Sequence, residues 1–499
     1  MSKQKKSYSQ IMKATSLFGG VQVFNILISV IRSKAIAILI GPVGFGVIGL
    51  LNSTLRIIGD FTKIGLDTSA VKEISEKNSD KDSSKVTEII FVLEKLIWFT
   101  GIVGALITLL FSRYISQLTF GNTDYTYAFV WLSIAVLFTQ LTKGKIAILQ
   151  GTRRLKKLAS ANLTASTVSL LLTLPLYFIF ELKGIVPALI ASAILTFIVF
   201  KFFTKDIEVP HFSFSKSKLF HKSKAMLMLG ATMSFTSIVV ALSAFLVQVF
   251  IRSTDGLDAV GFYSAGFLIV NAYVGMIFSA MSTDYFPRLV AINTDNEKMN
   301  VAVNQQADVA ILLITPVIVL FLTFAPFIVE LLYSSKFNVI IGFVTFGVLG
   351  TFFKAVSFSM GYVIIAKGHS KVFIILSILF NTSLLIICVL SYNRGGLTGI
   401  GLGYLIYYFI HLVTLKILTK QLYGISFTKS FYKTFTICGL ICASSYGVTL
   451  VESLYLRYSL LVLLVGISVG YSIVQFQQKM DLKQLLSSMF KKSTKDQTK

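Results

Sequence analysis

The chain alternates between long apolar runs and short polar connections along almost its whole length. A helix needs about 20 mainly apolar residues to cross a bilayer, and fourteen stretches meet that requirement. They cover residues 14–40, 44–68, 88–112, 126–147, 159–180, 185–203, 225–251, 259–283, 304–330, 338–365, 371–391, 396–418, 432–452 and 458–477. The pattern therefore predicts an all-α, polytopic membrane protein with about 14 transmembrane helices.

The composition agrees with this pattern. Of the 499 residues, 55% are hydrophobic and 14% are charged, and the mean hydropathy is +0.78. Soluble proteins of this size carry far more charge. The first apolar run is too long for the core of a signal peptide, so it is read as an uncleaved helix. Three cysteines and four histidines are scattered, which predicts neither a metal site nor a cofactor.

The position of the basic residues predicts the orientation of the chain. The formal net charge is +24, and 34 of the 46 Lys and Arg residues lie in or beside the two termini and the connections that follow the even-numbered spans. Six lie in the opposite connections. Because cytoplasmic segments carry the excess of Lys and Arg, both termini are predicted to be cytoplasmic. This placement explains the net charge without nucleic acid as a partner.

A glycine repeat predicts two related halves. "VGFGVIG" begins at Val43 and "VGFYSAG" at Val260, and "LQGTRR" precedes "AKGHSK" by the same interval of 217 residues. Two parallel six-helix halves around a central cavity form a transporter architecture. The predicted domains are the half at 14–203, the half at 225–420, an additional helix pair at 432–477 and a cytoplasmic tail at 478–499.

Basic residues inside the predicted spans need a separate explanation, because charge in a bilayer is unfavourable and usually functional. They are Arg32, Lys34, Arg56, Lys63, Lys95 and Lys354. In the first span, Gln22, Asn25, Ser29 and Arg32 share one face. In the second, Asn52, Arg56, Asp60, Lys63 and Asp67 share one face with alternating signs, so that neighbours can pair.

The depth of each charged side chain in its span and the direction in which it points indicate its role. Arg32, Arg56 and Lys354 lie deep in their spans and are predicted to line a cavity, with Asn271 on a milder polar stripe. Lys34 and Lys95 can instead extend to the interface, and Lys63 can form a solvated pair with Asp67. Asp60 and Asp308 are the candidates for charge pairing or ion coupling.

These residues predict a cationic, water-accessible cavity that takes an anion. Arginine suits phosphate because its planar fork donates two parallel hydrogen bonds. The chain has no Walker A pattern, which excludes this phosphate-binding loop as a direct route to ATP.

Five motifs resemble the Wzx flippases, the lipid III flippase-like translocases of the multidrug/oligosaccharidyl-lipid/polysaccharide exporter superfamily. They are "GPVGFG", "FGNTDY", "YFPRL", "LLYSSKF" and "GYVIIAKG". The resemblance runs from about residue 15 to 420. It places Lys34 and Lys354 at positions where that pattern also has lysine, which favours a cavity role for Lys34. Many Wzx proteins have twelve helices, so the helix pair at 432–477 departs from the pattern.

The resemblance implies a function in polysaccharide biosynthesis, including that of O-antigen and lipopolysaccharide. Such a flippase moves an undecaprenyl-pyrophosphate-linked oligosaccharide from the cytoplasmic to the periplasmic leaflet of the bacterial inner membrane. It works by alternating access and is not an enzyme. The implied partners are this lipid-linked oligosaccharide, membrane lipids, a proton or sodium ion, and a glycan polymerase or chain-length regulator.

Three other functions stay open. A lipid II flippase would share both the fourteen helices and a basic cavity. A multidrug exporter of the same superfamily would need an acidic cavity for organic cations. A membrane glycan polymerase or glycosyltransferase belongs to a different class and would need catalytic groups in large outer loops, whereas the longest such loop, at about 113–125, carries one carboxylate, Asp124.

Overall fold

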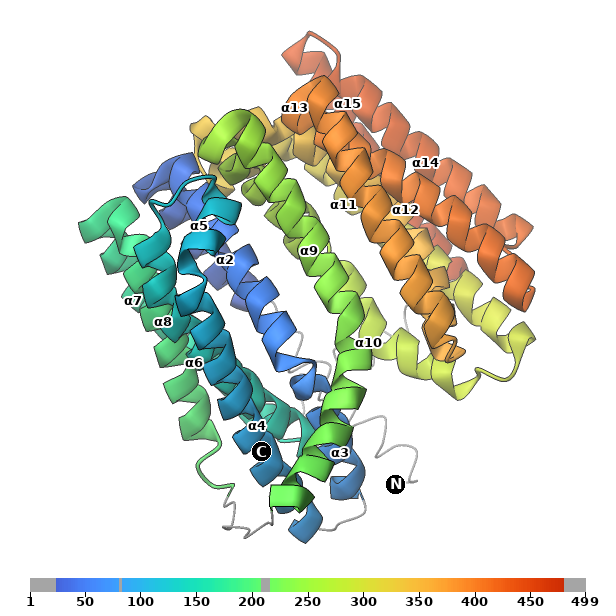
Figure 1. The fold of residues 1–499 in the computed structure, drawn as a ribbon. Helices are drawn as coiled ribbons and strands as arrows, with labels where there is room; N and C mark the ends of the chain where they lie inside the picture. Colours follow the sequence, from blue (N-terminus) through green and yellow to red (C-terminus); the bar gives the residue numbers. More distant parts are fainter. Residues whose placement is uncertain (1–23, 80–82, 208–215, 480–499) are drawn as a thin grey trace, which may run out of the picture. The chain divides into compact units, whose positions relative to one another are not determined.

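The computed structural model describes residues 24–79, 83–207 and 216–479, and within these ranges the chain forms helices and no strands (Figure 1). A first helix covers residues 24–39. The others are α2 (Gly41–Lys63), α3 (Leu66–Ser79), α4 (Ser83–Leu110), α5 (Ser112–Phe120), α6 (Thr126–Gly151), α7 (Leu155–Phe180), η1 (Glu181–Gly184), α8 (Ile185–Phe203), α9 (Lys216–Leu268), η2 (Ile269–Tyr273), α10 (Met276–Ala291), α11 (Asn296–Leu332), η3 (Ser335–Ile340), α12 (Ile341–Ala366), α13 (Ser370–Tyr423), α14 (Lys429–Thr449) and α15 (Leu454–Lys479).

The helices agree with the predicted spans in type. In the described residues, nine stretches are long and apolar enough to cross a membrane. Three of them hold two helices each, because the backbone leaves the helical region at η1, at Gly256 in α9 and at Gly395–Gly396 in α13. The first helix and α14 correspond to two further predicted spans, so the predicted total of about 14 is compatible with the structure. The prediction of an all-α, polytopic membrane protein is confirmed.

The second predicted span, 44–68, needs a correction. α2 ends at Lys63, and Ile64 and Gly65 adopt left-handed backbone conformations with φ of 48° and 65°. A Cβ on residue 65 would lie 2.2 Å from the carbonyl oxygen of Gly230, so this reversal requires glycine. Asp67 therefore lies on α3 rather than on the face of α2 predicted for it.

The chain divides into two compact units. Unit 1 takes the described residues of Met1–Ala265 with Leu331–Phe337 and Ser377–Leu385, and unit 2 takes Gly266–Glu330, Asn338–Leu376 and those of Ile386–Lys499. In unit 1, α4 packs against α6, and α8 packs against both α6 and α7 (Figure 1). The predicted halves at 14–203 and 225–420 stay a prediction.

Two glycines of the repeat motifs allow α2 and α9 to cross at very short distance. A Cβ on residue 46 would lie 2.1 Å from the carbonyl oxygen of Leu257, and one on residue 261 would lie 1.9 Å from that of Pro42. Both contacts are with backbone, which has little freedom to move aside. The repeated motif thus has a packing function in unit 1.

A charged clamp joins the start of α7 to the end of α8 outside the apolar segments. Lys157 Nζ lies 2.7 Å from the Asp206 carboxylate, and Arg154 contacts the same oxygen. The hydrogen bond from Lys157, with that from Arg154, lowers the pKa of Asp206 to about 2. Because this pKa is lowered, the clamp is fully formed at pH values above the usual pKa of a carboxyl group. It is lost only as the pH falls towards 2.

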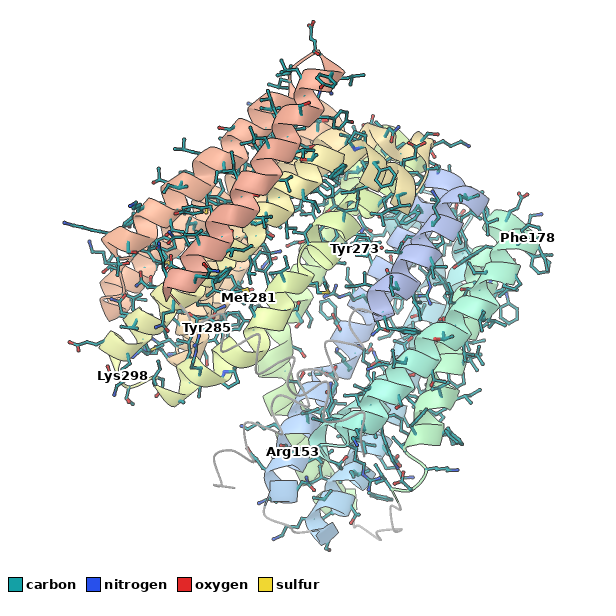
Figure 2. The ribbon with its side chains drawn as sticks, turned by 180° about the vertical axis from the view of Figure 1, so that it is seen from behind. Arg153, Phe178, Tyr273, Met281, Tyr285 and Lys298 are labelled. Atoms are coloured by element: carbon teal, nitrogen blue, oxygen red, sulfur yellow. The ribbon has the colours of Figure 1, made fainter. Side chains whose placement is uncertain are left out.

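Aromatic side chains pack α10 against α12 in unit 2. Tyr285 is fully buried on α10, and its hydroxyl donates to the carbonyl oxygen of Ser359 at 2.7 Å. Phe278 and Phe358 lie 5.7 Å apart between ring centroids. Tyr273, on η2, and Tyr285, on α10, are labelled in Figure 2. This packing fixes the stretch from η2 to α10 beside the middle of α12.

The C-terminal helix pair is held to α11 by side chains at two levels. Asn304 donates to the carbonyl oxygen of Ser426 at 3.0 Å and accepts from the amide of Thr428 at 2.9 Å. Further along, Ser472 of α15 donates to the carbonyl oxygen of Leu312 at 2.8 Å. The predicted pair at 432–477 is thus an integral part of unit 2.

Replacement of Asn304 by alanine is expected to loosen the start of α14. The Asn304 side chain is 7% exposed, and its removal leaves two backbone groups without their partner. This loss corresponds to about 1–3 kcal/mol of local stability. Hydrogen exchange at the amides of residues 425–431 measures this. Asn381→Ala is the control, because the hydrogen bonds of Asn381 to described residues stay within its own helix, to Ser377. Unchanged exchange in Asn304→Ala would show that the linker is held by other contacts.

Candidate functional site

Lys354 lies in the middle of α12 among groups that suit a cation. Its Nζ donates to Asn271 Oδ1 at 3.2 Å. It also lies over two aromatic faces, 5.5 Å from the ring centroid of Phe278 and 5.1 Å from that of Tyr408. Each such contact contributes about 0.5–2 kcal/mol, depending on how far water is excluded. The predicted residues Lys354 and Asn271 are therefore in direct contact.

An irregular backbone brings Asn271 to this position. η2 is a short π-helix, with the amide of Val274 donating to the carbonyl oxygen of Ile269 at 3.1 Å. A Cβ at Gly275 would lie 2.0 Å from the carbonyl oxygen of Asn271, so only glycine fits beneath this bend. Such π-turns are frequent at functional sites.

Lys354 has no carboxylate partner among the described residues. Its hydrogen-bond acceptor is the neutral amide of Asn271, and the nearby aromatic groups carry no negative charge. A partly buried ammonium in a membrane span is unfavourable unless an anion or water compensates it. The site therefore has an unmet preference for an anionic group.

A second charged cluster lies in unit 1, and we call it the Arg56 ladder: Arg56, Asp60, Lys63 and Asp67. Asp60 lies 3.7 Å from Arg56 Nε and 3.0 Å from Lys63 Nζ, and Lys63 lies 3.0 Å from Asp67. The contact from Lys63 to Asp67 crosses the break after α2. Asp60 and Lys63 have side chains that are 13% exposed, whereas that of Arg56 is 60% exposed.

The ladder forms one wall of a cavity of about 410 Å³, which we call the ladder cavity. Asn52, Arg56, Asp60 and Lys63 of α2 face α6 across it. On α6, Gln140 donates to the carbonyl oxygen of Gly59 at 2.7 Å, while its buried Oε1 has no hydrogen-bond partner among the described residues. Besides the charges of the ladder, the cavity thus offers the ammonium of Lys143, side-chain amides and two hydroxyls.

The polar stripe of the first helix faces α7 instead. Asn25 accepts a hydrogen bond from Ser166 at 3.1 Å, and Arg32 donates to Ser169 at 3.4 Å. Neither side chain lines the ladder cavity, so the cavity role predicted for them stays a prediction. The same holds for Lys34, which is partly buried. Gln22 lies outside the described residues.

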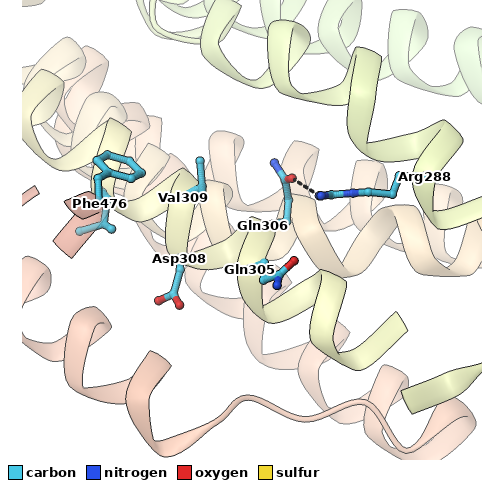
Figure 3. A pocket seen from close by; sticks show the side chains of 7 residues that line it. Arg288, Gln305, Gln306, Asp308, Val309 and Phe476 are labelled. Atoms are coloured by element: carbon cyan, nitrogen blue, oxygen red, sulfur yellow. Dashed lines mark hydrogen bonds between the residues drawn. The ribbon is translucent and has the colours of Figure 1, made fainter. Parts of the chain in front are cut away.

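Asp308 lines a cavity of about 390 Å³ in unit 2, formed by α10, α11 and α15. Arg288 of α10 donates to Gln306 Oε1 at 3.2 Å on one side, and Phe476 of α15 closes the other (Figure 3). The predicted part of Asp308 in charge pairing or ion coupling stays open.

Several groups of these sites were not predicted. Phe278 and Tyr408 are ordinary residues for apolar helices and give no signal of their own. Gln140 and Gln306 do give one, because a glutamine inside an apolar span needs a partner. Among the described residues, no cluster of His, Cys, Asp and Glu could hold a metal ion.

Replacement of Asp60 by asparagine is expected to destabilise unit 1 by about 1.5–3 kcal/mol, because Lys63 loses one of its two charged partners in a largely buried position. The midpoint of thermal unfolding in detergent measures this. Asp295→Asn is the matched control, since Asp295 pairs with Lys298, whose side chain is 73% exposed, and such pairs contribute little. Equal midpoints for the two variants would contradict a structural role for Asp60.

Comparison with solved structures defines the class of fold. The chain is similar to the lipid II flippase MurJ in an inward closed conformation, with a TM-score of 0.69, 15% identity, and 94% of this chain and 99% of that chain covered. It is also similar to an inward-facing multidrug resistance MATE family transporter of the MOP superfamily (TM-score 0.66, 14% identity, 83% and 99% covered). A third match is a MOP superfamily transporter from Pyrococcus furiosus whose structure is described as having a binding pocket of reverse polarity (TM-score 0.60, 14% identity, 83% and 96% covered).

The chain thus has the fold of the MOP superfamily transporters. It belongs to the polysaccharide biosynthesis protein family, whose sequence profile matches residues 35–342. No functionally curated protein matches it. These fold neighbours are a flippase and transporters, and the expectation that the chain is not an enzyme stays a prediction.

Proposed function

We propose that this protein is a flippase for an undecaprenyl-pyrophosphate-linked oligosaccharide, the repeat unit of O-antigen or another surface polysaccharide. It moves this lipid from the cytoplasmic to the periplasmic leaflet of the bacterial inner membrane by alternating access, with both termini in the cytoplasm. The family supports a role in polysaccharide biosynthesis, and the fold supports transport.

The observation that carries this proposal is Lys354. It is a cation in the middle of a membrane helix, held by an amide oxygen and two aromatic faces and by no carboxylate of the described residues. A phosphate oxygen 4 Å from such an ammonium contributes about 4 kcal/mol at an effective dielectric constant of about 20. An organic cation would be repelled by a similar amount, which argues against the multidrug exporter.

The ladder cavity supports the same class of substrate. Arg56 is the most exposed member of the ladder, and its fork can donate two hydrogen bonds to a phosphate. Asn52, Thr139, Gln140 and Ser237 also line this cavity and offer hydrogen bonds to sugar hydroxyls. We assign charge pairing to Asp60 and Lys63, and the binding of a coupling proton or sodium ion to Asp308.

A second candidate is a lipid II flippase, which the fold similarity to MurJ favours. That similarity covers 94% of this chain, against 83% for the MATE transporter, and so extends over more of the chain. Lipid II also carries a pyrophosphate, so the Lys354 site fits it equally well. The two candidates differ in the glycan.

Deletion of the gene in its host distinguishes them. For the proposed function, lipid-linked repeat units accumulate in the inner leaflet and surface polysaccharide is lost, while peptidoglycan stays intact. Peptidoglycan failure with accumulation of lipid II would instead establish the second candidate. Normal levels of both polymers would refute both.

A further inference from the structure

A groove on the side of α4, α6 and α8 in unit 1 shares no residue with the ladder cavity. We call it the α8 groove, and it has a volume of about 230 Å³. Leu93 and Ile97 of α4 and Phe197 of α8 form its apolar walls. Glu94, Lys145 and Lys201 add three charged groups, one from each helix. Helix packing alone does not explain why apolar and charged side chains line the same groove.

The surroundings of the α8 groove face lipid. Trp98, which lines it, is 48% exposed, and the adjacent Phe99 is 66% exposed. On α8, Ile198 and Phe202 are 53% and 59% exposed. In a membrane protein, large exposed apolar side chains of this kind contact acyl chains. The groove therefore opens towards the bilayer.

The two lysines of the groove lie towards the C-terminal ends of their helices. α6 ends at Gly151 and α8 at Phe203, so Lys201 is two residues from its helix end. Lys145 is six residues from the end of α6, or about 9 Å along the axis. Trp98 lies deeper, near the middle of α4, which runs from Ser83 to Leu110. The groove thus extends from the level of the lipid headgroups at Lys201 to the level of the acyl chains at Trp98.

The net charge of the α8 groove is positive. Lys145 pairs with Glu94 at 2.5 Å, and these two charges offset each other. Lys201 is the second lysine of the groove, and no carboxylate among the described residues pairs with it. A lipid phosphate at this position would satisfy Lys201 and would add a polar neighbour to the Glu94–Lys145 pair.

We propose that the α8 groove binds the headgroup of an anionic phospholipid such as phosphatidylglycerol. Lys201 and Lys145 contact the phosphate, and an acyl chain follows Ile97, Trp98 and Phe197. The volume equals that of about eight water molecules, which suits a phosphoglycerol group but not an oligosaccharide. The site is therefore distinct from the one that takes the transported substrate.

Native mass spectrometry of the purified full-length protein with phosphatidylglycerol or phosphatidylcholine tests this site. We expect preferential retention of phosphatidylglycerol, and a loss of about tenfold in its affinity for Lys201→Ala, the effect of one charge-assisted hydrogen bond. Lys205→Ala is the matched control, because Lys205 is exposed, lies over the Phe202 ring at 4.5 Å and does not line the groove. It should bind like the unchanged protein.

Fluorescence gives a second readout that does not depend on retention in the gas phase. The chain has two tryptophans, Trp98 and Trp131, so a Trp131→Phe variant reports on Trp98 alone. Brominated phosphatidylglycerol should quench Trp98 more strongly than brominated phosphatidylcholine, and Lys201→Ala should remove the difference.

Three results would overturn the proposal. One is equal retention of the two lipids by the unchanged protein, and another is equal loss in the Lys201 and Lys205 variants. The third is displacement of phosphatidylglycerol by an equimolar polyprenyl phosphate, which would assign the groove to the transported substrate. None of these results bears on the anion site at Lys354.

Discussion

Replacement of Lys354 by methionine is expected to abolish transport while leaving the fold intact or more stable. Methionine keeps much of the unbranched stem and its packing against Phe278 and Tyr408, but it removes the ammonium. A partly buried cation without a carboxylate partner destabilises the folded protein, so its loss should not lower the melting temperature. A lost charge-assisted contact to phosphate corresponds to about 10- to 100-fold slower transport.

Complementation of the deletion strain and thermal melting of the purified variant measure the two parts of this prediction. Lys416→Met is the matched control, because Lys416 also lies over an aromatic ring, that of Tyr432 at 5.0 Å, but is exposed at another position on α13. It should transport normally. Normal surface polysaccharide from Lys354→Met at normal protein levels would exclude Lys354 from substrate binding.

Replacement of Gly261 by alanine is expected to prevent the close crossing of α2 and α9. The added Cβ would lie 1.9 Å from the carbonyl oxygen of Pro42 and 3.1 Å from the amide nitrogen of Gly46, so the backbones must separate. Overpacking of this kind costs about 1–3 kcal/mol and more where backbone blocks the site. We expect a strongly lowered melting temperature and little folded protein in the membrane.

Gly466→Ala is the control for this substitution. Gly466 lies in α15, and a Cβ there would meet no atom within 4 Å. Alanine in an open helical position should be neutral or stabilising by about 0.5–1 kcal/mol. Melting of Gly261→Ala at the same temperature as the unchanged protein would contradict the crossing described for α2 and α9.

The pattern of charges indicated which residues of the Arg56 ladder lie close together, but it could not predict that α2 ends within the ladder. Spacing of three and four residues brought Arg56, Asp60 and Lys63 together, because a regular helix repeats its face at that interval. The left-handed reversal at Ile64 and Gly65 depends on the approach of Gly230, which is distant in sequence. Lys63 contacts Asp67 although this reversal lies between them.

The Lys354 site shows a different limit of sequence analysis. The position of the charge in its span was evident, and Asn271 was recognised as polar. Their contact depends on the π-helix at 269–273, which no periodic pattern of residues indicates. Phe278 and Tyr408 reach the ammonium from two further helices, and only tertiary packing selects them from the many aromatic residues of the chain.

The most direct test of the central claim is translocation of the proposed substrate by the purified protein. The lipid-linked oligosaccharide that accumulates in the deletion strain is reconstituted in the inner leaflet of proteoliposomes, and its appearance outside is followed with a lectin. We predict that the unchanged protein exposes the glycan and that Lys354→Met does not. Exposure no faster than in protein-free liposomes, together with export of an organic cation, would contradict the account.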